Sequence, residues 1–133
     1  QPRPPRVRQW TKANYWKHVD RGAFEGERVF LHRGEIIEMT PSGFDHGMGT
    51  TNSMYALIDA FPRSHYVVRV QLPFETPGNS VPEPDGLVCM REDAQRHPCP
   101  NRAVHVVEVA DGSLALDRDK AFDYAAAGVP EYW

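Results

Sequence analysis

The fold is decided by the stretch Val81–Trp133, which reads VPEPDGLVCMREDAQRHPCPNRAVHVVEVADGSLALDRDKAFDYAAAGVPEYW. Two apolar runs within it, Leu87–Met90 and Ala103–Ala110, are typical of central strands that are covered on both faces. The segment Leu116–Ala127 is rich in Ala, Asp and Lys and is followed by a glycine, which predicts a helix. The stretch therefore supplies two strands and a helix.

The residues before this stretch begin with a helix and a hairpin. Thr11 is a suitable helix cap and Gly22 a natural stop, so a short helix is expected between them. The segments Arg28–His32 and Glu35–Met39 flank a two-residue Arg-Gly connection, in which the glycine accepts a positive φ. This arrangement predicts a β-hairpin.

Two further elements follow the hairpin, after a break at Thr40–Gly43. Within Thr50–Phe61 the apolar residues recur at i, i+3, i+4 and i+7, which predicts an amphipathic helix. Tyr66–Phe74 alternates between apolar and polar residues, as a half-buried strand does. The whole order predicts an α/β (α+β) fold in which helices flank one mixed central β-sheet.

A length of 133 residues fits a single domain. We expect residues 10–133 to form it and residues 1–9, with three prolines and three arginines, to form a flexible arm. The arm either seeks phosphate or touches nothing. The formal net charge of -3 gives no global attraction to nucleic acid, so DNA binding would depend on a local basic patch.

The cysteines and the termini bear on the compartment and on the extent of the chain. Cys89 and Cys99 are too few for a disulfide framework, and no apolar run has the length of a signal or membrane span. We therefore expect a reducing cytoplasm. Since the first residue is Gln1 rather than Met, we also expect a trimmed start.

Two carboxylates are candidates for a metal site. Glu108 lies inside an apolar strand, where an ionised carboxylate is costly unless a cation or hydrogen bonds compensate it. Asp85 begins the preceding strand, so pairing of the two strands would bring both acids to one edge of the sheet. Hard oxygen ligands suit Mg²⁺ or Mn²⁺, which polarises a phosphodiester and lowers the pKa of an attacking water.

Lys120 is the third candidate. On a helical wheel it lies with Leu116 and Tyr124, the more apolar side, so we expect it to point toward the protein. A lysine beside two acids orients the water or stabilises the charge of the transition state in phosphoryl transfer.

Other interpretations of these residues remain open. The Pro-Asp-Gly sequence at Asp85 is a common turn, and Glu108 with Lys120 would also make a purely structural ion pair. A zinc site is a further alternative, although its four ligands would have spacings that fit no finger pattern: Cys89, His97, Cys99 and His105.

Several motifs together resemble the Uma-two family of restriction-endonuclease-like proteins, within the PD-(D/E)XK nuclease superfamily. They are RGEIIEMTP, His46, PEPDGLV, VHVVEVADGSLALDRDK and YAAAGVPEYW, and the resemblance runs from about Trp10 to the last residue. It implies that Asp85 and Glu108 are the metal-binding acids and that Lys120 is the family's helix lysine. The superfamily usually places this lysine two residues after the glutamate, where this chain has Ala110.

The chain departs from the family's pattern at two further points. The family commonly has a glutamate where this chain has Phe30, so one acidic ligand is missing, and nearby Glu35 either supports the site or is an exposed hairpin acid. Family members also continue past Tyr132-Trp133 with further strands, so we expect a C-terminally truncated domain whose open sheet edge a partner covers. His46 matches a family histidine that would bind phosphate or support the metal, unless it only caps or packs.

The leading functional hypothesis is a Mg²⁺- or Mn²⁺-dependent endonuclease that hydrolyses DNA phosphodiester bonds with Asp85, Glu108 and Lys120. A homodimer is expected, because two symmetric sites cut two strands most simply. The alternative is a catalytically inactive nuclease fold that binds nucleic acid or a protein partner, which the net charge and Phe30 favour.

Overall fold

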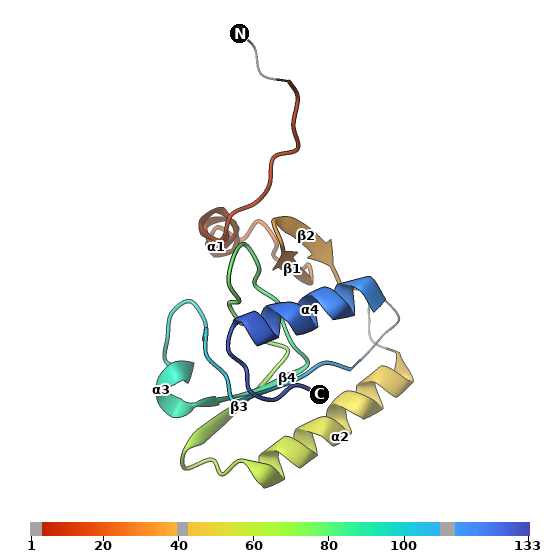
Figure 1. Cartoon of the computed structure of the whole chain (residues 1–133), viewed down its shortest axis with the longest axis vertical. Helices are drawn as coiled ribbons and strands as arrows, with labels where there is room; N and C mark the ends of the chain where they lie inside the picture. Colours follow the sequence, from red (N-terminus) through yellow and green to blue (C-terminus); the bar gives the residue numbers. More distant parts are fainter. Residues whose placement is uncertain (1–3, 40–42, 110–113) are drawn as a thin grey trace.

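The computed structural model describes residues 4–39, 43–109 and 114–133. Its elements, in order, are α1 (Lys12–Asp20), β1 (Val29–His32), β2 (Glu35–Glu38), α2 (Phe44–Ala60), β3 (Tyr66–Val70), β4 (Gly86–Met90), α3 (Arg91–Ala94), β5 (His105–Val107) and α4 (Leu114–Ala126) (Figure 1). The predicted order of elements is confirmed, with the short helix α3 as an addition. Ala110 and most of the predicted break at residues 40–43 lie outside the described residues.

The described strands form two antiparallel sheets rather than one mixed sheet. β1 pairs with β2, and the other three strands pair in the order β3-β4-β5. A single isolated bridge between Leu31 and Val81 links the hairpin to the segment before β4, which is too little pairing to merge the two sheets. Within the part of the chain that the structure describes, parallel pairing is confined to an isolated bridge between Val106 of β5 and Tyr132. The α+β class is therefore confirmed, and the prediction of a single sheet is wrong.

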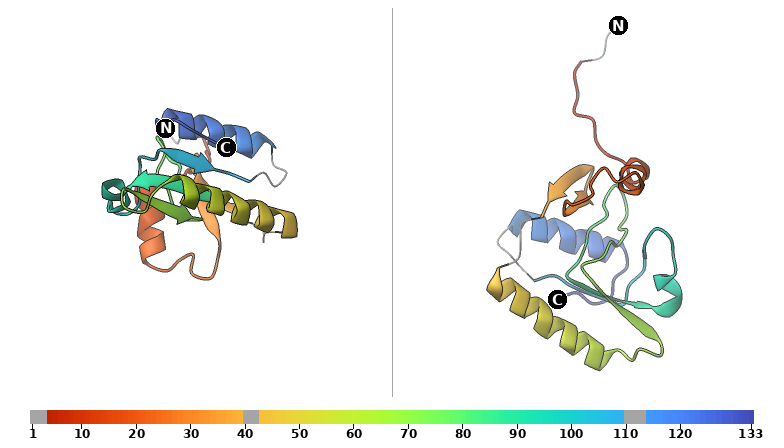
Figure 2. Two further views of the ribbon diagram at one scale, coloured as in Figure 1. Left: turned by 90° about the horizontal axis from the view of Figure 1, so that it is seen from below. Right: turned by 180° about the vertical axis from the view of Figure 1, so that it is seen from behind.

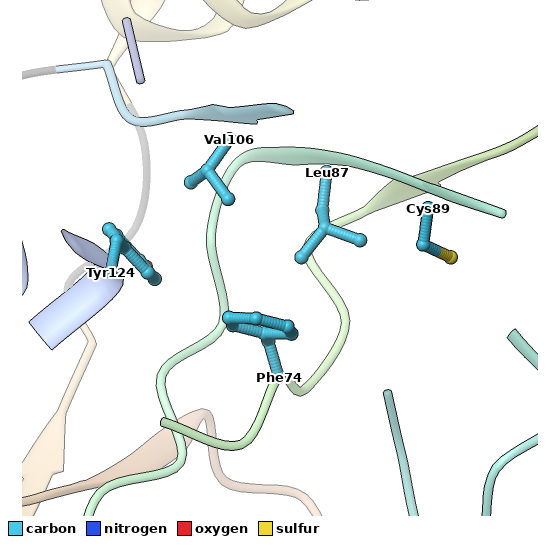
Figure 3. Packing of buried hydrophobic residues seen from close by; sticks show 5 residues of the cluster. All are labelled: Phe74, Leu87, Cys89, Val106 and Tyr124. Carbon is cyan, nitrogen blue, oxygen red and sulfur yellow. The ribbon is translucent and has the colours of Figure 1, made fainter. Parts of the chain in front are cut away.

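The three-stranded sheet lies between α4 and α2 (Figure 1). On one face Leu87 and Val106 pack with Tyr124 of α4, together with Phe74 and Cys89 (Figure 3). On the other face Val88 of β4 packs with Leu57 of α2. Because successive strand residues point to opposite faces, β4 and β5 are covered on both sides, as their continuous and nearly continuous apolar runs predict.

The first helix and the hairpin have the predicted ends. The Asn14 N–H donates to Thr11 Oγ1 at 3.2 Å, and Gly22 follows α1 with φ at 77°. The hairpin turn has positive φ at Arg33 and at Gly34, as a two-residue turn of this kind requires. The exposed residues 4–9 contain no helix or strand and extend away from α1 (Figure 2, right).

The helix α2 begins at Phe44, six residues earlier than the apolar spacing predicts. Two glycines in its first turns obscure the pattern, because glycine is a poor helix former. At Gly49 a Cβ atom would lie 3.1 Å from Val109 Cγ1, so a glycine here lets the helix approach the end of β5 closely. None of the described helices is long and apolar enough to cross a bilayer.

The strand β3 ends at Val70, four residues earlier than the alternating pattern predicts. Gln71 has φ at 51°, in the left-handed region, and this turns the chain out of the strand. Leu72, which the alternation assigned to the buried face, is 45% exposed, as is Val70 at the end of β3.

Candidate functional site

Three polar residues lie side by side where β3, β4 and β5 end on the same side of the sheet. The residues at the paired ends of the strands are Val70, Gly86 and Val107. The next residue beyond each of these strand ends is polar: Gln71, Asp85 and Glu108, in that order across the sheet. The antiparallel pairing of β4 and β5 thus places Asp85 opposite Glu108, the arrangement in which the two acids were expected to meet. Asp85 lies in a bend immediately before β4.

Each of the two acids is held by the backbone of the other's segment. The Asp85 N–H donates to Glu108 Oε1 at 3.0 Å, and the Val109 N–H donates to Asp85 Oδ2 at 2.8 Å. Hydrogen bonds from backbone amides to carboxylates are strong and directional. This reciprocal pair of bonds therefore fixes both carboxylates relative to the sheet.

Lys120 of α4 completes the cluster. Its Nζ lies 2.9 Å from Glu108 Oε2, and the two side chains are only 14% and 9% exposed. The same Nζ lies 4.7 Å from the centroid of the Phe30 ring in β1, a distance at which a cation is attracted to an aromatic face. Phe30 thus occupies a position beside the cluster, where the family resemblance leads one to expect an acid.

The hairpin holds α4 in place over the site. Arg33 Nη1 lies 3.3 Å from Asp119 Oδ1, and Arg33 Nη2 lies 3.0 Å from Asp123 Oδ1. His32 Nε2 lies 3.2 Å from Asp119 Oδ2. These contacts join the hairpin to α4, the helix from which Lys120 reaches the acids.

Burial dominates the protonation behaviour of Glu108. Desolvation raises the pKa of this carboxyl, and the Lys120 ammonium is the largest influence that lowers it. The negative charge of Asp85 raises the pKa again. Burial, followed by the charge of Glu108, also raises the pKa of Tyr132 to about 12. The cluster therefore carries an excess of negative charge in a poorly solvated position, which a cation would relieve.

His46 and Glu35, the two residues predicted to support the metal site, lie in different places. His46, in the first turn of α2, places Nε2 3.4 Å from Asp85 Oδ2, and its buried Nδ1 has no hydrogen-bond partner in the described ranges. Glu35 opens β2 opposite His32 and is exposed. The structure brings His46 to the acids and leaves Glu35 on the hairpin surface.

Sequence reasoning missed Gln71. Its side-chain Nε2 lies 3.5 Å from Asp85 Oδ1, and its backbone N–H donates to the Asp85 carbonyl oxygen at 3.2 Å. The strand register would have revealed it, because a polar residue that ends the strand beside Asp85 stands next to it across the sheet.

We predict that Gln71→Val lowers the free energy of unfolding by about 1–2 kcal/mol, because a β-branched residue is strained at positive φ. Gln71→Asn should remain near wild-type stability, since asparagine tolerates this conformation. Urea denaturation of both variants measures the difference. Equal stability of the two variants would show that residue 71 does not keep the left-handed backbone conformation.

The chemistry of the cluster fits a hard divalent cation. Asp85 and Glu108 offer carboxylate oxygens, and Mg²⁺ is usually bound through one or two carboxylates with water and phosphate oxygens as its other ligands. No group of three or more His, Cys, Asp and Glu side chains within the described ranges is placed to hold a metal. A closed zinc site needs four such ligands. Cys89 and Cys99, proposed as zinc ligands, instead lie in separate core clusters.

Comparison with known proteins places the chain among nuclease-like proteins. A search of curated proteins found no match. The crystal structure of a "putative nuclease belonging to DUF820" from Anabaena variabilis superposes with a TM-score of 0.62 at 13% identity, which indicates a shared fold. The match covers 85% of this chain and 66% of the Anabaena chain. This chain therefore spans slightly less than two thirds of the length of that protein. Residues 16–133 match the Uma2 (Uma-two) family, described as "Putative restriction endonuclease", and the chain belongs to this family.

Proposed function

We propose that this protein is a metal-dependent endonuclease that hydrolyses DNA phosphodiester bonds at the cluster of Asp85, Glu108 and Lys120. The observation that carries the proposal is the meeting of two largely buried carboxylates and a lysine where neighbouring strands end, in a member of a family described as "Putative restriction endonuclease". Clusters of strongly interacting buried charges are common at catalytic sites.

Asp85 and Glu108 would hold the Mg²⁺ or Mn²⁺ ion, which supplies polarisation of the phosphodiester and a lowered pKa for bound water. The protein itself contributes by fixing the positions of the two carboxylates. Because each carboxylate accepts a backbone N–H from the other's segment, neither has to reorganise when substrate arrives. His46 and Gln71 restrain Asp85 from two further directions.

Lys120 contributes positive charge next to the reacting phosphate. Its ammonium has three N–H donors, and the contact with Glu108 uses one of them. With DNA bound, we assign a second donor to the attacking water or to a phosphate oxygen, where negative charge develops in the transition state. Phe30 and the helix position hold Lys120 for this role.

The proposal is tested by incubating supercoiled plasmid and linear duplex DNA with the purified protein in Mn²⁺, in Mg²⁺ and in a chelator. Cleavage is expected only with metal and should be lost in the Asp85→Ala, Glu108→Ala double variant. The matched control is Glu92→Ala, which removes an exposed acid of α3. Cleavage that persists in the double variant would refute the assignment.

Phe30 favours one alternative, a catalytically inactive nuclease fold that binds nucleic acid or protein. An aromatic ring beside Lys120, where an acid is expected from the family, leaves the metal with one ligand fewer. This alternative predicts DNA binding that a chelator does not change. A gel-shift assay in Mn²⁺ and in chelator separates the two functions.

A further inference from the structure

The N-terminal arm and the helix α1 border a pocket beside the turn of the hairpin. Its volume is about 280 Å³, and its lining consists of a guanidinium, two carboxamides, an indole and an imidazole, from Arg8, Gln9, Trp10, Asn14 and His18. Pockets that hold a whole small molecule usually measure about 300–1,000 Å³. The volume therefore suits one group of a longer ligand.

Trp10 is held in place at one side of this pocket. Its backbone N–H donates to the carbonyl oxygen of Gly34 in the hairpin turn at 2.9 Å. Its indole ring meets the His18 ring edge-on, with centroids 4.9 Å apart, and lies 5.9 Å from the Phe24 ring. These contacts leave the residue only partly buried. The indole therefore offers a fixed aromatic surface to another planar group.

The polar side chains of the pocket supply both hydrogen-bond donors and acceptors. Gln9 and Asn14 each carry a carboxamide, which both donates and accepts. His18 Nδ1 lies 2.8 Å from the Asn14 carbonyl oxygen, and because a carbonyl oxygen can only accept, this nitrogen carries a hydrogen. The Nε2 atom of the same ring is then left for a ligand. The edges of nucleobases present the same mixture of donors and acceptors.

The charge around the pocket favours an anionic ligand. Residues 1–19 contain five lysines and arginines and no Asp or Glu, although the whole chain has three more acidic residues than lysines and arginines. Arg6 and Arg8 are exposed, and no ion pair among the described residues involves either of them. Among those residues no carboxylate lines the pocket, so a cationic ligand would find no countercharge there. This end of the chain is therefore the local basic patch that nucleic-acid binding requires.

We propose that this pocket binds one unpaired nucleotide of a nucleic-acid strand, with the base stacked on Trp10 and a phosphate paired with Arg8. The choice of nucleic acid as the ligand rests on the proposed function. An aromatic ring beside positive charge is the usual means by which proteins hold single strands. Carboxamides contact base edges, and guanidinium groups bind phosphate oxygens. A base inside a duplex must first leave its stack, so the pocket should select unpaired nucleotides.

The pocket is separate from the cluster of acids, and the hairpin connects the two places. The hairpin lies next to both α1 and α4 (Figure 1). At one end Phe30 contacts Lys120, and at the other Gly34 binds Trp10. Four residues of extended chain span at most about 13 Å, and a duplex strand rises by about 3.4 Å per nucleotide. The nucleotide in the pocket would therefore lie a few positions along the strand from the cleaved bond.

Titration with an oligothymidylate in a chelator, where no metal-dependent cleavage occurs, tests the pocket. Tryptophan emission should fall as a base stacks on Trp10, and Trp10→Leu should weaken binding by between about fivefold and 150-fold, the range for loss of one stacked base. Trp10→Phe should keep most of the affinity but lose the change in emission, because neither Trp16 nor Trp133 lines the pocket. Arg8→Ala should lower the steepness with which binding falls with salt by about 0.7 on logarithmic scales.

Arg102→Ala is the matched control, because it removes an exposed arginine outside the pocket and should bind the oligothymidylate as the wild type does. Circular dichroism verifies that each variant is folded. Undiminished binding by folded Arg8→Ala and Trp10→Leu would overturn the proposal. So would an equal fall in emission with a duplex, or an equal affinity for thymidine monophosphate, which would assign the pocket to a free nucleotide.

Two comparisons separate the pocket from the proposed cleavage. The Asp85→Ala, Glu108→Ala double variant should bind the oligothymidylate in chelator at least as tightly as the wild type, because it changes only the cluster of acids. Cleavage by the wild type together with unchanged binding by the pocket variants would refute the pocket alone. Binding that depends on Trp10 and Arg8, in a protein that cleaves no DNA in Mn²⁺ or Mg²⁺, would refute the proposed cleavage alone.

Discussion

Replacing Asp85 with alanine is expected to abolish saturable Mn²⁺ binding and to lower metal-dependent DNA cleavage by about 10²-fold or more. Loss of a residue that merely orients a metal ligand typically costs 10–100-fold in affinity or activity, and loss of a ligand should cost no less. The variant also frees the Val109 N–H, which donates to Asp85 Oδ2 in the wild type. Calorimetric titration of Mn²⁺ into both proteins measures the binding directly.

Two matched variants separate loss of a ligand from loss of structure. Asp85→Asn retains an oxygen for the Val109 N–H but lacks the charge, so it should fold normally and bind Mn²⁺ weakly. Glu92→Ala makes the same change in net charge on exposed α3 and should bind Mn²⁺ like the wild type. Undiminished Mn²⁺ binding by Asp85→Ala would remove Asp85 from the metal site. An absence of binding in the wild type would favour the inactive fold.

The central part of the fold and the meeting of the acids were predictable from local sequence patterns. The run that became β4 is wholly apolar and the run around β5 is broken only by His105 and Glu108, which is typical of strands covered on both faces. Once those strands pair, their register alone puts Asp85 opposite Glu108. The helical wheel likewise indicated the side of α4 on which Lys120 lies.

The remaining features depend on long-range packing that local patterns do not encode. Gln71 adopts a left-handed backbone that alternation does not reveal, and this shortens β3. The early start of α2 is hidden by its two glycines, and the close approach of Gly49 to Val109 exists only in the assembled fold. The separation of the hairpin into its own sheet depends on how little of β1 pairs with the segment at Val81.

The largest effect on stability is expected for Lys120→Met, which should lower the free energy of unfolding by about 3 kcal/mol at neutral pH in the absence of metal. Breaking a buried ion pair leaves an uncompensated charge, and Glu108 and Lys120 are both largely buried. Methionine retains most of the packing volume of the lysine stem. The loss therefore reports the charge of Lys120 rather than its size.

The pH dependence of this loss distinguishes an ion pair from a packing contact. The pKa of Glu108 in the folded protein is already above its ordinary value of 4.5, and loss of the Lys120 ammonium should raise it further. A raised pKa favours the protonated carboxyl in the folded state, so the penalty applies at high pH and disappears as the pH falls through that pKa. In urea denaturation from neutral to acidic pH, the free energies of unfolding of the variant and the wild type should thus converge.

Two further variants serve as controls. Lys120→Arg should behave as the wild type does, and adding Glu108→Gln to Lys120→Met should recover stability at neutral pH. A deficit that is the same at neutral and acidic pH would assign Lys120 a packing role instead.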